Sequence, residues 1–172
     1  MAKKKADAHG AAQSGLKGEV ILKNTLAAHG LRLLKKKYEF EGVKGAGYDV
    51  YERVINLKSP YDNGYFTSDG FCPELGCVFE IKYGRAHGTT EEKIFFDLEK
   101  IRDGVYDTGY PLVYVFWGTP EVASSSNTGR CWAKVFRDKV EKENLPVKVV
   151  FATTDNGFEK FITEAKQARG IL

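Results

Sequence analysis

Residues 68–82 read SDGFCPELGCVFEIK, which is the pattern of a β-hairpin whose turn lies at residues 73–76. The Pro-Glu-Leu-Gly segment favours a tight turn because proline and glycine are both turn-forming residues. If the turn is centred between its second and third residues, Asp69 lies directly opposite Glu80 on the neighbouring strand. A turn one residue longer or shorter would move Asp69 off that face, so this hypothesis depends on the register of the hairpin.

Charged side chains are expected to converge on one face of this hairpin. Because side chains alternate along a strand, Glu80 and Lys82 share a face with Asp69, whereas Phe79 and Ile81 form the other, apolar face. Two like charges opposite each other destabilise a sheet by about 0.2–1 kcal/mol unless a group such as a hard divalent cation neutralises them. A carboxylate pair that binds Mg²⁺ can polarise a phosphodiester and lower the pKa of a bound water, with the lysine as electrostatic and general-base partner. The alternative interpretation is an exposed ion-pair stripe along a surface strand.

The elements around the hairpin alternate between helix and strand. Apolar residues near helical spacing predict a helix from Ser14 to Gly30, and the continuous apolar run at 112–117 predicts a strand buried on both faces. This order predicts an α/β fold with a mixed central β-sheet flanked by helices. The other expected elements are strands at 31–40, 48–57 and 147–152 and helices at 90–103, 131–143 and 155–168, the last with Asp155 as its N-cap.

Composition and charge predict one soluble intracellular domain. The 172 residues suffice for a single domain, here residues 15–172, preceded by a flexible basic tail at residues 1–14. Residues 1–60 carry 12 Lys and Arg against 6 Asp and Glu, although the whole chain has a net charge of only +3, so a polyanionic partner fits the first part. No apolar stretch has the length of a membrane span or a signal core, which favours a cytoplasmic location. Three cysteines without paired CxxC motifs argue against a zinc ribbon or a disulfide scaffold.

An acidic residue that is followed, after ten residues, by Glu-x-Lys resembles the motif of the PD-(D/E)XK nuclease superfamily. Here the motif is Asp69 and then Glu80-Ile81-Lys82, and Ser68 stands where the motif name has proline. The resemblance implies a restriction-endonuclease-like core with the element order αβββαβ. That order is similar to the one predicted above from the periodicity.

The resemblance also implies roles for individual residues. It places a metal-site glutamate on the first helix, a position that Glu19 fits. Asp69, Glu80 and Glu19 would bind Mg²⁺, for which Mn²⁺ would substitute, and together with Lys82 they would form the catalytic set. Asp49 competes with Asp69 as the first metal acid.

Basic residues on both sides of the motif are candidate DNA contacts. The segment after the second hairpin strand resembles the loop and helix start that follow the catalytic strand in restriction-endonuclease-like proteins, where exposed N–H groups would hold a phosphate. The alternative is an ordinary capped helix with surface charges. The candidate DNA contacts are Lys35, Lys36, Lys37, Arg85, His87, Thr89 and Lys93.

Taken together, these residues predict a Mg²⁺-dependent DNA endonuclease that hydrolyses phosphodiester bonds with a metal-activated water. A restriction- or homing-type enzyme with site-specific cleavage would act as a homodimer, so that two sites reach two strands. A structure-selective, phage-type junction resolvase or a nickase fits the same residues. A non-catalytic nucleic-acid-binding protein with this fold is the remaining alternative, although such a protein has no need of two carboxylates that face a phosphate.

Overall fold

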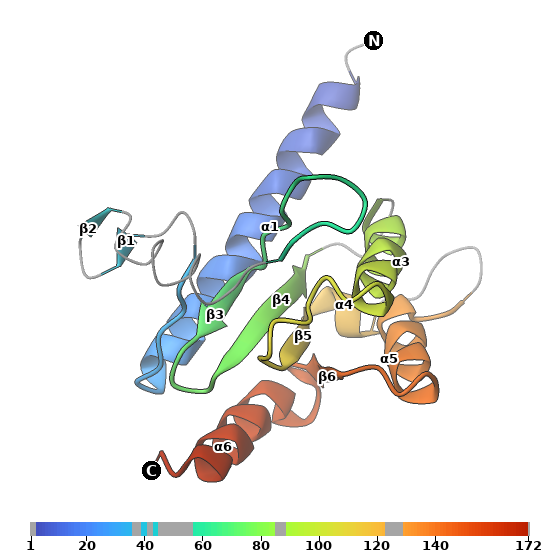
Figure 1. The fold of residues 1–172 in the computed structure, drawn as a ribbon. Helices are drawn as coiled ribbons and strands as arrows, with labels where there is room; N and C mark the ends of the chain where they lie inside the picture. The colour runs from blue at the N-terminus through green and yellow to red at the C-terminus, as the bar shows by residue number, and fades with distance from the viewer. Residues whose placement is uncertain are drawn as a thin grey trace.

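A four-stranded mixed β-sheet forms the centre of the protein (Figure 1). The computed structural model describes residues 3–35, 39–40, 43–44, 57–84, 89–122 and 129–171. In the order β3-β4-β5-β6, β3 runs antiparallel to β4, and β4, β5 and β6 are parallel. The predicted α/β class with a mixed central sheet is therefore confirmed. The strands are β3 (Gly70–Cys72), β4 (Cys77–Tyr83), β5 (Leu112–Trp117) and β6 (Val147–Phe151).

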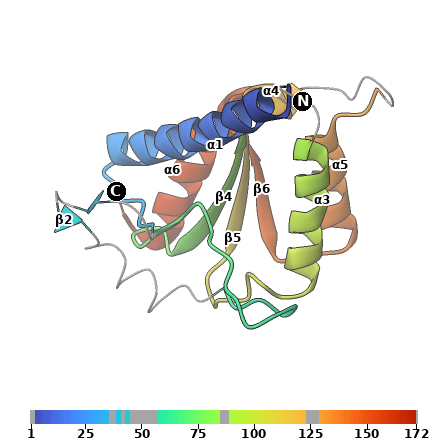
Figure 2. The same cartoon turned by 90° about the horizontal axis from the view of Figure 1, so that it is seen from above.

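Helices cover both faces of this sheet and make three layers. Figure 2 shows α1 and α6 on one face and α3 and α5 on the other. The longer helices are α1 (Lys3–Ala28), α3 (Thr89–Arg102), α5 (Trp132–Lys142) and α6 (Gly157–Arg169). The shorter elements are α4 (Thr119–Val122), the 3-10 helix η1 (Thr154–Asn156) and an antiparallel pair of β1 (Glu39–Phe40) with β2 (Val43–Lys44).

The hairpin of β3 and β4 has the predicted register. Cys72 pairs with Cys77 and Gly70 with Phe79, across a turn at residues 73–76. The turn ends at Gly76, whose φ of 56° lies in the left-handed region that favours glycine. The three cysteines, Cys72, Cys77 and Cys131, are free thiols.

The strand β5 is buried on both faces, which explains why its sequence is apolar without alternation. Its even-numbered side chains, such as Tyr114 and Phe116, pack in one core with α3 and α5. Its odd-numbered side chains, Val113 and Val115, pack in a second core with α1 and α6. The sheet therefore has an apolar layer on each side, and a charged group in either layer needs partners.

The first helix is longer than predicted. It begins at Lys3, so residues 3–14 are helical where we expected a tail without regular structure; the mobility of residues 1–14 stays a prediction. Alanine and lysine favour a helix even without an apolar face, and this segment is rich in both. The helix ends at Ala28, and Gly30 follows with a φ of 72°, in agreement with the expected end.

Other predicted boundaries also differ. The segment expected as one strand at 31–40 contains the β-bridge of Leu34 with Phe71 and, separately, β1, while residues 45–56 lie outside the described part. The last helix begins at Gly157 with Asn156 as its N-cap, because Asp155 lies inside η1. In the ranges that the structure describes, no helix is long and apolar enough to cross a membrane.

Gly18 allows α1 to lie close to β4. A Cβ atom on Gly18 would lie 2.7 Å from Cβ of Tyr83, closer than two non-bonded carbon atoms normally approach. We therefore predict that Gly18→Ala lowers the free energy of unfolding by about 1–3 kcal/mol. An alanine in an uncrowded helix would instead raise it by about 0.5–1 kcal/mol. Urea denaturation measures the change, with the exposed Lys17→Ala as matched control; a more stable Gly18→Ala protein would contradict the close packing.

Candidate functional site

The hairpin places Asp69 and Glu80 opposite each other. Asp69 directly precedes β3, and its N–H donates a hydrogen bond of 3.0 Å to the carbonyl oxygen of Phe79. Its carboxylate accepts a hydrogen bond of 2.8 Å from the N–H of Ile81. The ladder thus continues one residue beyond β3, and the predicted juxtaposition of the two acids is present.

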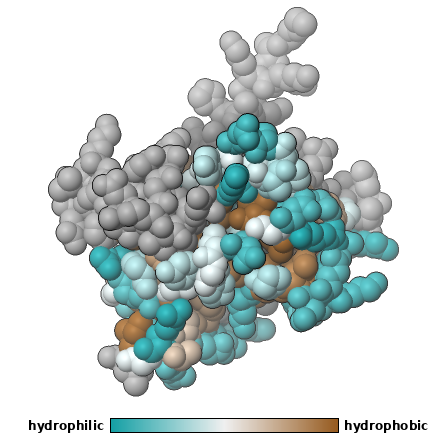
Figure 3. All heavy atoms as spheres, viewed as in Figure 1, coloured by the Kyte–Doolittle hydropathy of each residue, from teal (hydrophilic) through white to brown (hydrophobic). Residues whose placement is uncertain are grey.

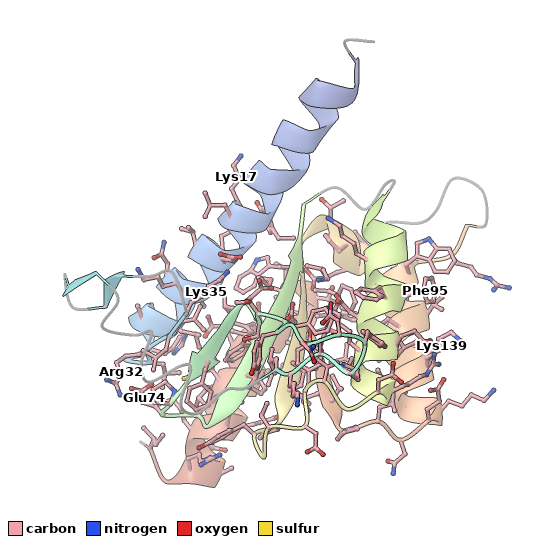
Figure 4. The ribbon with its side chains drawn as sticks, turned by 45° about the horizontal axis from the view of Figure 1, so that its top comes forward. Lys17, Arg32, Lys35, Glu74, Phe95 and Lys139 are labelled. Atoms are coloured by element: carbon pink, nitrogen blue, oxygen red, sulfur yellow. The ribbon has the colours of Figure 1, made fainter. Side chains whose placement is uncertain are left out.

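Helix α1 places Glu19 near the hairpin, and the ammonium of Lys35 lies between Glu19 and Asp69. Nζ of Lys35 lies 2.5 Å from Oε1 of Glu19 and 3.9 Å from Oδ1 of Asp69. Lys35 is held there because the preceding residue, Leu34, pairs with Phe71 through two backbone hydrogen bonds. Figure 4 shows Lys35 close to α1. The side chain of Lys35 is only 11% exposed, so it lies among carboxylates and not on the open surface where we expected a phosphate contact.

The pKa values of both hairpin carboxyls are raised. Burial, together with the neighbouring Asp69, raises the pKa of Glu80 well above its ordinary range. Burial also raises the pKa of Asp69. Lys82, a backbone amide and Lys35 lower this pKa, but by less than burial raises it. The hydroxyl of Tyr106 donates a hydrogen bond of 2.9 Å to Oε1 of Glu80. An added cation would therefore stabilise the ionised form of this pair.

Lys82 lies beside Glu80 but is bound to a different carboxylate. Its Nζ is 2.7 Å from Oδ2 of Asp97 on α3 and 3.9 Å from Oε2 of Glu80. Asp97 also contacts Nζ of Lys100 at 2.5 Å and accepts a hydrogen bond of 2.7 Å from the hydroxyl of Tyr114. Burial alone would raise the pKa of Asp97, but the two ammonium groups lower it.

The positive charge of Lys82 is stabilised by its surroundings. Burial by itself lowers the pKa of this ammonium, yet the carboxylates of Glu80, Asp97 and Asp69 raise it above its ordinary value. Lys82 is therefore a fixed cation in this arrangement. That state suits electrostatic stabilisation of an anion and not the removal of a proton from water.

Asp97 was missed by the sequence analysis, although a signal for it exists. The apolar stripe of α3 consists of Ile94, Leu98 and Ile101, and Asp97 falls within the same stripe. A carboxylate at such a position is buried, here with only 4% of its surface exposed, and must have charged or polar partners. Its partners come from β4 and β5, and the helix sequence alone does not identify them.

The predicted metal centre is assembled only in part. Asp69 and Glu80 offer the oxygen ligands that Mg²⁺ prefers, and because burial raises their pKa values, a bound cation would favour their ionised form. Glu19, the third predicted ligand, binds Lys35 instead. Within the described residues, no group of three or more His, Cys, Asp or Glu side chains is placed to hold a metal ion. The carboxylate pair therefore fits a cation, and the set of three ligands stays a prediction.

The remaining predicted contacts are less well defined. Thr89 is the first residue of α3, and Lys93 is exposed one turn further along. The side chain of Thr89 lies outside the described part of the structure, and within that part no ion pair joins Lys93 to the carboxylate pair. Lys36, Lys37, Asp49, Arg85 and His87 lie outside the residues that the structure describes.

An exposed aromatic group borders the site. The rings of Tyr61, Phe66 and Phe96 contact one another, with centroids 6.2–6.4 Å apart. Tyr61 and Phe96 are 52% and 50% exposed. Figure 3 shows apolar residues in the middle of the face that it draws, with polar residues around them. Nζ of Lys100 lies 5.1 Å from the centre of the Phe66 ring and also binds Asp97. The aromatic group is thus connected to the charged cluster through one lysine.

Comparison with known proteins adds no functional information. No family model, curated protein or solved structure matches this chain. The case for a function consequently depends on the geometry and the charges of the site.

Replacing Glu80 by glutamine tests the uncompensated charge. Because the pKa of Glu80 is raised in the folded protein, its carboxylate costs stability above the ordinary pKa of about 4.3, and this cost is absent at lower pH. We predict that Glu80→Gln stabilises the metal-free protein by roughly 1 kcal/mol near pH 8 and has little effect near pH 4. Thermal unfolding at the two pH values measures this difference. The exposed Glu164→Gln is the control, and equal destabilisation by Glu80→Gln at both pH values would contradict the interpretation.

Proposed function

We propose that this protein is a Mg²⁺-dependent endonuclease that hydrolyses phosphodiester bonds in DNA. The observation that carries the proposal is the pair of opposed carboxylates with raised pKa values, Asp69 and Glu80, with the ammonium of Lys82 beside them. A surface ion-pair stripe, which was the alternative, would be exposed. Here Glu80 is only 6% exposed, so burial favours a site over a stripe.

Each side chain has a distinct role in this proposal. Asp69 and Glu80 would bind the cation, with Glu19 as an additional ligand or a hydrogen-bond acceptor for water. When bound, Mg²⁺ would polarise the phosphodiester and lower the pKa of the attacking water. Lys82, which is held protonated, would stabilise the negative charge that develops on the phosphate oxygens. The general-base role that the sequence also suggested for Lys82 has less support.

The topology supports the restriction-endonuclease-like core. Helix α1, the antiparallel β3 and β4, helix α3 and the parallel β5 follow the expected order. The bridge of Leu34 with Phe71 holds the segment at residues 31–35 along the outer edge of β3, which supports a third antiparallel strand there, as that core would require. The basic first part of the sequence adds charge that suits a polyanionic substrate.

The cleavage assay tests the whole proposal. With supercoiled plasmid, we expect nicking or linearisation that needs Mg²⁺, also proceeds with Mn²⁺ and stops with EDTA. Glu80→Ala and Lys82→Ala should each reduce the rate on the order of 10²-fold or more, since each removes a charge that acts in the transition state. The exposed Glu164→Ala should cleave like the wild type.

Three results would count against the proposal. Cleavage without a divalent cation, or equal cleavage by the wild type and Lys82→Ala, would refute the mechanism. DNA binding without cleavage would favour a non-catalytic binding protein with this fold.

If the enzyme is a homodimeric restriction- or homing-type nuclease, linear product should appear without prior accumulation of nicked circles.

The aromatic group favours a structure-selective enzyme as the second candidate. Exposed rings stack on unpaired bases, and each stacked base contributes about 1–3 kcal/mol. We predict that four-way or splayed junctions are cleaved faster than linear duplex, and that Phe96→Ala lowers junction cleavage by roughly tenfold while linear duplex is unaffected. Competition between the two substrates measures this, with the exposed Val122→Ala as control. Equal loss on both substrates would leave the site-specific alternative in place.

A further inference from the structure

We propose that Asp97 is a positioning residue, which holds the ammonium of Lys82 away from Glu80 so that Glu80 stays available for a cation. This inference rests on the proposed function, because it concerns the same site. Neither the motif nor its expected ligands include Asp97. The proposal is carried by the geometry of the buried cluster.

The distances show which carboxylate determines the position of the Lys82 ammonium. The side chains of Glu80 and Lys82 project from the same face of β4. Without another partner, the ammonium of Lys82 would therefore pair with Glu80. Instead it lies 2.7 Å from Asp97 and 3.9 Å from Glu80. The four-carbon side chain of lysine has many rotamers, so a fixed ammonium position needs a partner of this kind.

Asp97 is itself held rigidly. It lies on α3 with 4% of its surface exposed, and three groups bind it: Lys82, Lys100 and the hydroxyl of Tyr114. These contacts come from a helix and two parallel strands, so the carboxylate cannot follow Lys82 if that side chain moves. Asp97 is therefore an anchor with a fixed position.

Stability alone is a weak explanation for this anchor. Replacing a buried ion pair by apolar residues of similar volume is often neutral or stabilising. Asp97 lies between apolar positions of α3, where a leucine would extend the core around Leu98 and Ile101. The charged residue therefore has its clearest effect on the placement of Lys82.

Lys35 offers a comparison within the same site. Its ammonium binds Glu19 directly, at 2.5 Å, and this contact competes with any cation at Glu19. Lys82 would do the same to Glu80 if Asp97 did not bind it. Lys82 differs from Lys35 in that its ammonium binds a buried carboxylate on α3 at 2.7 Å.

The test is Asp97→Asn, which removes the charge with little change in shape. Calorimetry with Mn²⁺ alone measures binding without any need for cleavage. We expect Asp97→Asn to bind Mn²⁺ about tenfold more weakly than the wild type, because Lys82 then pairs with Glu80. The double variant Lys82→Met/Asp97→Asn should recover the affinity of Lys82→Met within about twofold. The turnover number of Asp97→Asn on plasmid should fall about tenfold or more, whereas its KM for DNA stays within about twofold.

The controls separate this inference from the proposed function. Glu99→Gln, on the exposed side of α3, should bind Mn²⁺ and cleave like the wild type. A wild-type protein that neither binds Mn²⁺ nor cleaves would refute the nuclease proposal itself. If the wild type is active and Asp97→Asn matches it in Mn²⁺ affinity and turnover, the role of Asp97 is refuted. If Asp97→Asn does not fold, the double variant is compared with Lys82→Met. A Mn²⁺ affinity of the double variant more than about fivefold below that of Lys82→Met would refute the inference, because Asp97 would then act on Mn²⁺ binding without Lys82.

Discussion

The antiparallel pairing of β3 with β4 is the constraint on which the rest of the site depends. Its register places Asp69 opposite Glu80, and the backbone amide of Ile81 fixes the first of these carboxylates. A shift by one residue would turn Asp69 to the side of Phe79, into the core under α1 and α6. The turn at residues 73–76 therefore determines which side chain faces Glu80 at the far end of the hairpin.

Charge is distributed around this hairpin in a definite way. Glu19 has Lys35, and Asp97 has Lys82 and Lys100, so these acids are compensated by ammonium groups. Burial raises the pKa values of Asp69 and Glu80, and their ammonium neighbours at 3.9 Å only partly offset this effect. Asp69 and Glu80 are thus the carboxylates with the least compensation by ammonium groups, and a divalent cation would stabilise their ionised form most.

Most of the fold could be predicted from the sequence because it follows from local patterns. The turn residues predicted the hairpin register, and the uninterrupted apolar run predicted a strand buried between two helix layers. The length of α1 was wrong because helix propensity in residues 3–14 carries no apolar period. Asp155 was wrong as an N-cap because it lies inside η1, which precedes the last helix and moves the N-cap by one residue to Asn156.

The candidate site, like the fold, could be predicted from the sequence only where local patterns determine it. The sequence by itself determined that Asp69, Glu80 and Lys82 share one face of a hairpin, because strand alternation and turn length are local properties. Only the tertiary structure decided which ammonium meets which carboxylate: Lys35 binds Glu19, and Lys82 binds Asp97. The physical reason is that a buried charge takes its partner from whichever element packs against it, and that packing depends on the whole sheet and its helices.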